Sequence, residues 1–278
     1  MTIRDVLVPF IDAELDEPVL DAVEAMEVFA DAHLTALVIS ALPAPIAAAD
    51  ASMSAAMIGE VIAQVREEGA RTAARLRERA KSPALEVQAI ESWSHAAVDA
   101  AIAAARHRDI TVMAIAPRNR ETGVRNDVFE GVLMESGRGL LALPTGVKPP
   151  KAFKRIMIAW DATREAVRAT VAAAPFFDRA DAIKIVTVDA HPSPRGLDEA
   201  PGAEFAAHLA RGGRDVEVLN LDGQGRQISE VILSAAVDMD ADLIVMGAFH
   251  HARLQQAIFG GVTRTLLETT RIPLLLAH

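Results

Sequence analysis

Residues 242–247 read Asp-Leu-Ile-Val-Met-Gly, and residues 109–114 read Asp-Ile-Thr-Val-Met-Ala. Each stretch places one acidic residue before a short, nearly continuous apolar run, which is typical of a parallel strand covered on both faces. A second pair of stretches also matches: residues 6–10 read Val-Leu-Val-Pro-Phe, and residues 156–160 read Ile-Met-Ile-Ala-Trp. The copies lie roughly 130–150 residues apart, which is too far for a solenoid repeat and indicates a duplicated domain.

Strand-length apolar runs alternate with amphipathic helical segments on both sides of these matched stretches. The predicted strands are 6–10, 34–40, 85–90, 110–116 and 139–143, then 155–160, 183–189, 216–221, 243–247 and 273–277. This alternation predicts an α/β fold made of two tandem, doubly wound, five-stranded parallel sheets of the Rossmann-like kind. The prolines and lysines of residues 145–151 mark a boundary, so we expect domains at residues 1–146 and 152–278.

Residue type also suggests where two helices of the first half begin. Pro18 suits the first turn of a helix, where its missing N–H group costs nothing, so the sequence predicts a helix over residues 18–32. Ser92 or Ser94 is expected to supply the N-cap of the helix that ends at Arg108, because serine hydroxyls accept bonds from the first free N–H groups.

The composition excludes several classes of function. The chain has no cysteine, which rules out disulfides, thiolate nucleophiles and zinc–thiolate sites and fits a reducing compartment. Its net charge is −10, with the acidic excess mostly in the first half, so we expect no nucleic-acid partner. We see neither a signal peptide nor an apolar run of membrane-spanning length, and we therefore expect a soluble, cytoplasmic protein with no membrane partner.

In open parallel sheets, ligands bind beyond the carboxyl ends of the strands, where the strand order reverses. Asp161 follows the opening strand of the second half at such an end. Its carboxylate could accept a hydrogen bond from an adenine amino group or a ribose hydroxyl. Alternatively, Asp161 could be the N-cap of the helix that starts near Thr163.

A second candidate element is the loop that runs from Gly247 to Thr263. Gly260 and Gly261 precede a predicted helix, where backbone N–H groups and the helix dipole favour phosphate oxygens. Thr263 could add a hydroxyl donor and Arg253 a positive charge. The alternative is a flexible crossover loop with a Gly-Gly hinge.

These features together resemble the universal stress protein family. The resemblance rests on the opening strand followed by Asp161-Ala-Thr-Arg-Glu-Ala, on residues 242–247, on Gly260-Gly-Val-Thr and on Ile272-Pro-Leu-Leu-Leu. It covers nearly all of residues 153–278, while the first half is similar in layout more than in motif. The whole chain thus looks like a tandem member of the family.

The resemblance implies an adenine-nucleotide site in the second half. The ATP-binding motif of the family, G-x2-G-x9-G-[S/T], falls on Gly247, His250, Gly260 and Gly261, so its second and fourth positions depart from the pattern. Thr263 lies two residues beyond, and His250 could contact a phosphate itself. By resemblance, a nucleotide would be lined by Asp161, Val188, Gly247, Gly260 and Thr263, with Val188 making main-chain contacts to the base.

The first half departs further from the motif. Ala114, Pro117 and Asp127 stand at its first three positions when the matched fourth strands are aligned. Ile11 lines up with Asp161, although Asp12 is adjacent. Because an acidic Asp127 would repel phosphate, we interpret this half as one that does not bind ATP.

The expected function is that of a stress-response regulatory protein that binds ATP or AMP, with Mg²⁺ only if ATP is bound. Residues 247–263 contain no Asp or Glu to hold Mg²⁺, which favours a binding protein over an enzyme. The alternatives are a lipid-like ligand without nucleotide and a slow ATPase. Nucleophile-elbow, P-loop and G-x-G-x-x-G motifs are missing, and the eight histidines form no metal pattern, so we expect no catalytic residue and no metal site.

The closing strands of the two halves suggest how the chain is assembled. Residues 139–143 and 273–277 are expected at sheet edges with unpaired backbone groups. In the family this edge joins two domains, so we expect the halves to pair within one chain. A homodimer of such chains is compatible with the same edge.

Overall fold

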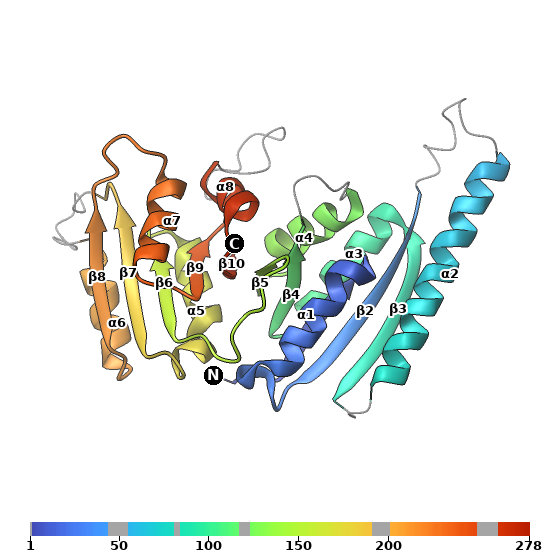
Figure 1. Ribbon diagram of the computed structural model, residues 1–278, viewed down its shortest axis with the longest axis horizontal. Coiled ribbons are helices and arrows are strands. Elements are labelled where there is room, and N and C mark those ends of the chain that lie inside the picture. The colour runs from blue at the N-terminus through green and yellow to red at the C-terminus, as the bar shows by residue number, and fades with distance from the viewer. Residues whose placement is uncertain (1, 44–54, 81–83, 117–122, 191–200, 249–260) are drawn as a thin grey trace. The chain divides into compact units, whose positions relative to one another are not determined.

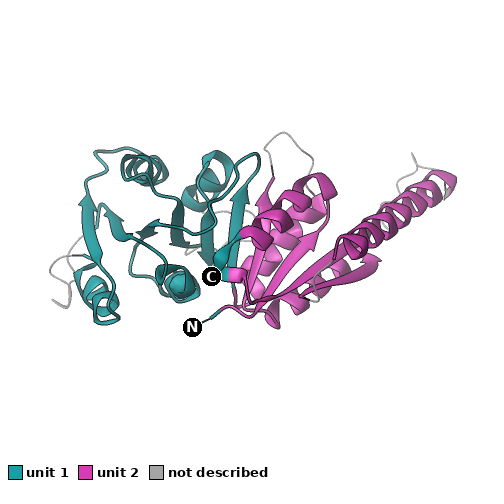
Figure 2. Ribbon diagram, turned by 60° about the horizontal axis from the view of Figure 1, so that its bottom comes forward, with its two compact units in different colours: residues 1–2, 26–28, 139–278 teal, residues 3–25, 29–138 magenta. Residues whose placement is uncertain are grey.

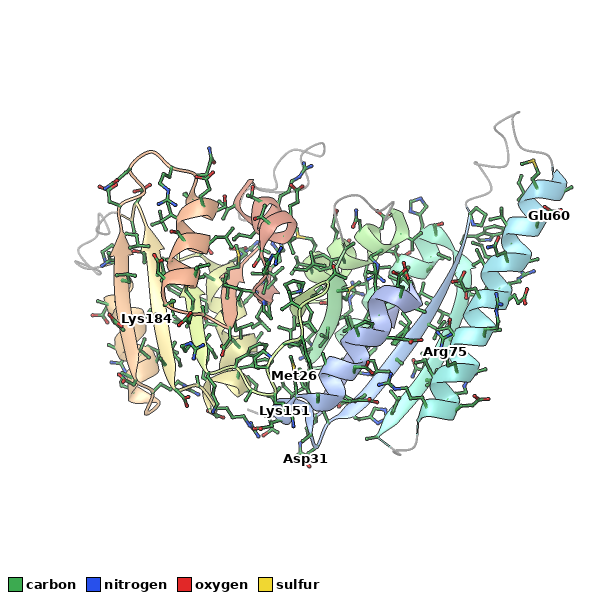
Figure 3. The ribbon with its side chains drawn as sticks, in the orientation of Figure 1. Met26, Asp31, Glu60, Arg75, Lys151 and Lys184 are labelled. Atoms are coloured by element: carbon green, nitrogen blue, oxygen red, sulfur yellow. The ribbon has the colours of Figure 1, made fainter. Side chains whose placement is uncertain are left out.

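The computed structural model describes residues 2–43, 55–80, 84–116, 123–190, 201–248 and 261–278. The chain divides into two compact units, which Figure 2 colours separately. The N-terminal unit comprises residues 3–25 and 29–138, and the C-terminal unit comprises residues 1–2, 26–28 and 139–278. Residues 26–28 join the C-terminal unit because the Glu27 backbone N–H donates to the Lys151 carbonyl at 2.9 Å, and Figure 3 shows Met26 close to Lys151.

The N-terminal unit contains a parallel sheet in the order β3-β2-β1-β4 (Figure 1). Its strands are β1 (Asp5–Phe10), β2 (His33–Leu42), β3 (Leu85–Trp93) and β4 (Ile110–Ile115). Its helices are α1 (Ala13–Ala25), α2 (Ala55–Arg79), α3 (Ser94–Arg106) and α4 (Gly123–Glu135). The 3-10 turn η1 (Glu27–Phe29) has its first two residues in the C-terminal unit and its third in the N-terminal unit. Charged pairs tie α2 to α1, since Arg75, labelled in Figure 3, contacts Glu17 at 2.5 Å.

The C-terminal unit has the strand order β5-β10-β9-β6-β7-β8. Its strands are β5 (Gly139–Pro144), β6 (Arg155–Ala159), β7 (Ala182–Val188), β8 (Val216–Leu221), β9 (Leu243–Gly247) and β10 (Leu274–Ala277). Its helices are α5 (Arg164–Phe177), α6 (Ala203–Arg211), α7 (Ile228–Asp238) and α8 (Gly261–Thr269). All neighbours pair in parallel except β5 and β10, so the predicted doubly wound parallel architecture is confirmed.

The matched stretches that open the fourth strands make the same contacts in both units. In the N-terminal unit, the Asp109 carboxylate accepts from the backbone N–H groups of Arg4 and Asp5 at 2.7 and 3.1 Å. In the C-terminal unit, the Asp242 carboxylate accepts from Lys154 and Arg155 at 2.8 and 3.0 Å. The repeated aspartate therefore fastens the start of the first strand to the start of the fourth, and the apolar residues that follow it are buried in the sheet.

Two predicted helix starts in the N-terminal unit are wrong. Helix α1 begins at Ala13 rather than at residue 18 and ends at Ala25, with Pro18 inside it. Asp12 is the reason, because its carboxylate accepts from the Glu14 N–H at 3.0 Å and caps the helix earlier. Helix α3 begins after Trp93, without a side-chain cap, and the Ser94 hydroxyl donates instead to the Leu42 carbonyl at 2.9 Å.

The two closing strands lie side by side. Strand β10 pairs antiparallel with β5, with Leu275 opposite Leu141, and parallel with β9 on its other side. The expectation that residues 273–277 leave unpaired backbone is therefore wrong, whereas the expected pairing of the two closing strands is confirmed. Because β5 clusters with the C-terminal unit, the domain boundaries at 1–146 and 152–278 stay a prediction. Within the described residues, no helix is long and apolar enough to cross a bilayer.

Candidate functional site

The strand order of the C-terminal unit reverses between β6 and β9. Strand β6 lies between β7 and β9, and the helices that follow β6 and β9 are α5 and α8. A cavity of about 300 Å³ opens at the carboxyl ends of these strands. Its position is the one that a doubly wound sheet offers to a ligand.

The cavity has an apolar wall and a polar wall. The apolar wall is formed by the side chains of Val186, Val188, Ile228, Ile232 and Met246. The polar wall comprises Asp161, Thr163, Glu165 and Thr263. A ligand that fits this cavity needs a flat or apolar part and a part rich in hydrogen-bonding groups.

The structure brings together five of the residues that the sequence placed at the site. Asp161, Val188, Gly247, Gly261 and Thr263 all line the cavity, although they come from four separate segments of the chain. The other three predicted residues, His250, Arg253 and Gly260, lie outside the described residues. What any of the eight does to a ligand stays a prediction.

Asp161 organises the turn that leads from β6 into α5. Its Oδ1 atom accepts from the Thr163 backbone N–H at 3.1 Å and from the Thr163 hydroxyl at 2.6 Å. Thr163 is the N-cap, because its hydroxyl accepts from the Ala166 N–H at 3.2 Å, so the interpretation of Asp161 as the cap is wrong. Between them, Ala162 has a φ of 58°, a left-handed conformation that a β-carbon makes unfavourable.

Gly247 is needed where β9 meets the start of α5. A β-carbon at this position would lie 2.5 Å from the Ala166 nitrogen and 2.7 Å from the Glu165 carbonyl carbon, both of them backbone atoms. The glycine therefore allows helix and strand to approach closely. This packing role accounts for the glycine whether or not a phosphate binds beside it.

Gly261 and Thr263 lie in the first turn of α8, a helix of nine residues. A β-carbon on Gly261 would meet no described atom within 4 Å, so this position is open. The Thr263 side chain is buried and faces the cavity. The first turn of α8 thus offers the cavity a hydroxyl and the positive end of a helix dipole.

Glu165 is a site residue that the sequence pattern did not single out. It is only 2% exposed, and its carboxylate forms a hydrogen-bonded ion pair with Arg164, whose side chain is 72% exposed. Its β-carbon lies 2.8 Å from the point where a Gly247 β-carbon would stand. The backbone and β-carbon of the buried Glu165 therefore border the glycine at which the predicted phosphate loop begins.

The sequence pattern also missed most of the apolar residues of the site, among them Trp160, Ile228 and Ile232. Trp160 lines the cavity and stacks on Phe205 of α6, with ring centroids 3.8 Å apart and an interplanar angle of 5°. Ile228 and Ile232 face the cavity from α7, and Ile228 is 42% exposed. The spacing of Ile228 and Ile232, four residues apart at a helix start, is a signal that could have placed them on one face.

The N-terminal unit has an ion pair in the equivalent place. Helix α4 begins Gly123-Val-Arg125 where α8 begins Gly261-Val-Thr263, so Arg125 stands in the position of Thr263. The Arg125 guanidinium donates to the Asp16 carboxylate at 2.5 Å, and both side chains are buried, at 4% and 1% exposure. Burial raises the pKa of Asp16, and the neighbouring guanidinium opposes that rise.

This geometry corrects the alignment of the motif in the first half. Asp127 lies inside α4 and is exposed, so it does not stand where a phosphate would bind. The alignment failed because the segment between β4 and α4, residues 116–122, is shorter than residues 248–260 between β9 and α8. The side chain that replaces the ligand-facing threonine is Arg125, which is already paired.

Comparison with known proteins agrees with the fold. Residues 152–278 match the family model described as "Universal stress protein family". A universal stress protein from Archaeoglobus fulgidus DSM 4304 is 16% identical with a TM-score of 0.74, and the match covers 99% of this chain and 96% of that one.

Two proteins from Pseudomonas aeruginosa share the same fold. The functionally unknown PA1789 of strain PAO1 and a putative universal stress protein of strain UCBPP-PA14 are each 16% identical, with TM-scores of 0.55 and 0.53. Each match covers 99% of this chain, with 92% and 93% of the respective structures. No curated protein matches the chain. Residues 152–278, a little under half of the chain, are therefore similar to the universal stress protein family.

Proposed function

We propose that the chain is a regulatory binding protein of the stress response, and that its C-terminal unit binds the adenosine part of AMP or ATP. The observation that carries this proposal is the cavity between β6 and β9, which is lined by Asp161, Val188, Gly247, Gly261 and Thr263 together. Such a cavity at the reversal of a doubly wound sheet is where mononucleotides bind.

The apolar wall suits a purine base. Val186 and Val188 of β7 and Ile228 and Ile232 of α7 line the same cavity of about 300 Å³, which is at the lower end of the volumes of small-molecule pockets. Stacking a flat base between these aliphatic groups would remove apolar surface from water on both of its faces.

The polar wall suits a ribose and its first phosphate. Asp161 uses only Oδ1 in its bonds to Thr163, and its Oδ2 atom accepts no hydrogen bond from the described residues. That oxygen is available to a ribose hydroxyl or to an adenine amino group. The first turn of α8 contributes the Thr263 hydroxyl and free backbone N–H groups to a phosphate.

A pair of matched glycine variants tests the location of the site. Gly261→Asp places a carboxylate at the start of α8, and Gly123→Asp does the same at the start of α4, and neither β-carbon meets a described atom within 4 Å. We expect Gly261→Asp to weaken AMP binding at least about tenfold in calorimetric titration, through repulsion of the phosphate, and Gly123→Asp to leave it unchanged. Equal AMP affinity in both variants would show that α8 does not face the phosphate.

The same purified chain distinguishes the alternative ligands. Protein prepared without added nucleotide is denatured, and the released small molecules are identified by mass spectrometry. Recovered AMP or ATP supports the proposal. Recovery of a lipid instead, with no thermal shift on adding AMP, ATP or adenosine, contradicts it and favours the lipid-like ligand. If the wild-type chain releases inorganic phosphate from ATP and the Gly261→Asp variant does not, the slow ATPase is favoured.

A further inference from the structure

Strand β3 is the outer strand of the N-terminal sheet. It pairs with β2 on one side, and no described strand pairs with its other side (Figure 1). The Ala84 carbonyl accepts from the Leu34 N–H at 2.7 Å, so the backbone groups of every second residue, counted from Ala84, turn toward β2. The backbone groups of Val87, Ala89 and Glu91 therefore turn outward, and they form an open edge.

Strand β3 lacks the features that usually protect such an edge. Its nine residues include no proline, no glycine and no lysine. Trp93, at its carboxyl end, is 46% exposed. The other outer strand of the chain, β8, has six residues, so it offers a shorter edge. Length, regular sequence and an exposed indole all suit β3 to pairing with another strand.

We infer that β3 pairs antiparallel with β3 of a second copy of the chain, with Ala89 opposite itself on the two-fold axis. In this register Val87 exchanges hydrogen bonds with Glu91 of the second copy, and Ala89 with Ala89, which gives about six hydrogen bonds between the chains. Ala89 is exposed, so the centre of this contact is open. No residue that lines the adenosine cavity takes part, and the inference does not depend on the proposed function.

Charge complementarity selects a second copy as the partner. In this register Glu86 lies opposite Ser92 of the second copy, and Glu91 lies opposite Val87, so neither carboxylate meets another carboxylate. A shift by one residue would place Glu86 opposite Glu91, which repulsion between like charges disfavours. The strand therefore fits a copy of itself in the one register that also pairs all of its outward groups.

The two carboxylates of the edge are also compensated within their own chain. The Arg66 guanidinium of α2 donates to Glu91 at 2.8 and 2.9 Å. The His33 ring of β2 lies 3.0 Å from the Glu86 carboxylate. Two copies, each with a net charge of −10, can therefore meet at β3 without bringing uncompensated negative charge together.

Trp93 gains a partner in the same register. The bond between Arg66 and Glu91 shows that α2 covers the face of the sheet on which Glu91 lies, and Trp93, two residues further along β3, lies on that face too. The register places Trp93 opposite Leu85 of the second copy. Aromatic and aliphatic side chains in directly opposite positions stabilise antiparallel pairs, and the two-fold axis repeats this pair at both ends of the contact.

Single cysteines test the register, because the chain has none of its own. Opposite residues that exchange hydrogen bonds have Cα atoms about 5.5 Å apart, within the span of a disulfide. We expect the Ala89→Cys variant to form a disulfide-linked dimer in a mild oxidant, seen on a non-reducing gel. Ser92→Cys is the matched control on the same strand, because its two copies would lie roughly 20 Å apart and should not link.

Sedimentation equilibrium of the whole chain over a concentration series tests the contact itself. The wild-type chain should reach twice the mass of one chain. Ala89→Lys places two ammonium groups opposite each other on the axis and should raise the dissociation constant of the dimer at least about tenfold. Ser92→Lys adds the same charge opposite Glu86 and should leave that constant unchanged or lower it. Circular dichroism shows whether each variant is folded.

The outcomes decide the inference. A dimer that links through Ala89→Cys and not through Ser92→Cys, and that Ala89→Lys weakens, supports it. A chain that stays monomeric at every concentration overturns it, and so does a dimer that Ala89→Lys leaves intact, which would use another surface such as β8. Equal linking by the two cysteine variants also overturns it. If Ala89→Lys does not fold, the two cysteine variants decide.

Discussion

Replacing Arg125 with methionine should destabilise the N-terminal unit strongly at neutral pH. The substitution removes the guanidinium that faces the Asp16 carboxylate at 2.5 Å, in a place where the two side chains are 4% and 1% exposed. An ionised carboxylate left unpaired at such a depth costs about 3–5 kcal/mol. The backbone N–H groups of Ile11 and Asp12 still donate to Asp16, at 2.8 and 2.9 Å, so we expect the lower end of that range.

The loss of unfolding free energy in the Arg125→Met variant should depend on pH, because a proton bound to Asp16 removes the unpaired buried charge. Burial raises the pKa of Asp16 above its unfolded value of about 3.9, and the removal of Arg125 raises that pKa further. A raised pKa in the folded state gives stability that is fully present below the unfolded value and is lost as the pH rises through the folded value. The variant should therefore be nearest to wild type in acid and furthest from it at pH 7.

Urea unfolding followed by fluorescence at about pH 4.5 and about pH 7 measures both effects. The chain has two tryptophans, and in a Trp160→Phe background only Trp93 of the N-terminal unit remains. Arg138→Met is the control, because Arg138 is exposed and its guanidinium donates to a backbone carbonyl, that of Arg106, rather than to a carboxylate. If Arg125→Met lowers the free energy of unfolding by less than about 1 kcal/mol at pH 7, or by the same amount at both pH values, the role given to the ion pair is refuted.

Two further substitutions concern the turn and the strand end beside the cavity. Gly247→Ala should lower the free energy of unfolding by about 1–3 kcal/mol in the same urea assay, because its β-carbon would lie 2.5 and 2.7 Å from backbone atoms. Gly261→Ala should leave that free energy almost unchanged, because its β-carbon would lie within 4 Å of no described atom. Similar values for both variants would contradict the packing role. Ala162→Gly should gain about 0.5–1 kcal/mol by relieving a φ of 58°, and a loss of stability would show that the turn is not left-handed in solution.

The strands were the most predictable part of the structure. The sequence prediction matches β8 and β9 to the residue, because each is a short, mainly apolar run bounded by polar residues, although only β9 is buried. Helix starts were less predictable, since they depend on which side chain reaches a free N–H group. Pro18 suggested a helix start at residue 18, but the helix begins earlier, because the Asp12 carboxylate accepts from the Glu14 N–H. That contact can be seen only in the structure.

The site residues that a sequence motif places could be predicted. Those that a tertiary contact brings to the cavity could not. Asp161 and Thr263 follow from their places at a strand end and at a helix start, and Val188 follows from the family resemblance. Glu165 did not, because nothing in its sequence neighbourhood shows that α5 approaches β9 closely enough to bury it. Arg125 was overlooked for a related reason, since the loop before α4 is shorter than its counterpart and shifts the register of the motif.

The stoichiometry of adenosine binding tests the central claim most directly. The chain contains two related sheets. The C-terminal sheet has a cavity of about 300 Å³ between β6 and β9, whereas the N-terminal sheet has a smaller one of about 200 Å³ and holds the Asp16–Arg125 pair at the equivalent helix start. Calorimetric titration of the wild-type chain with adenosine should therefore give one saturable site per chain, and Ile232→Asp in the apolar wall should abolish it. No saturable binding, or two equivalent sites per chain, would contradict the account.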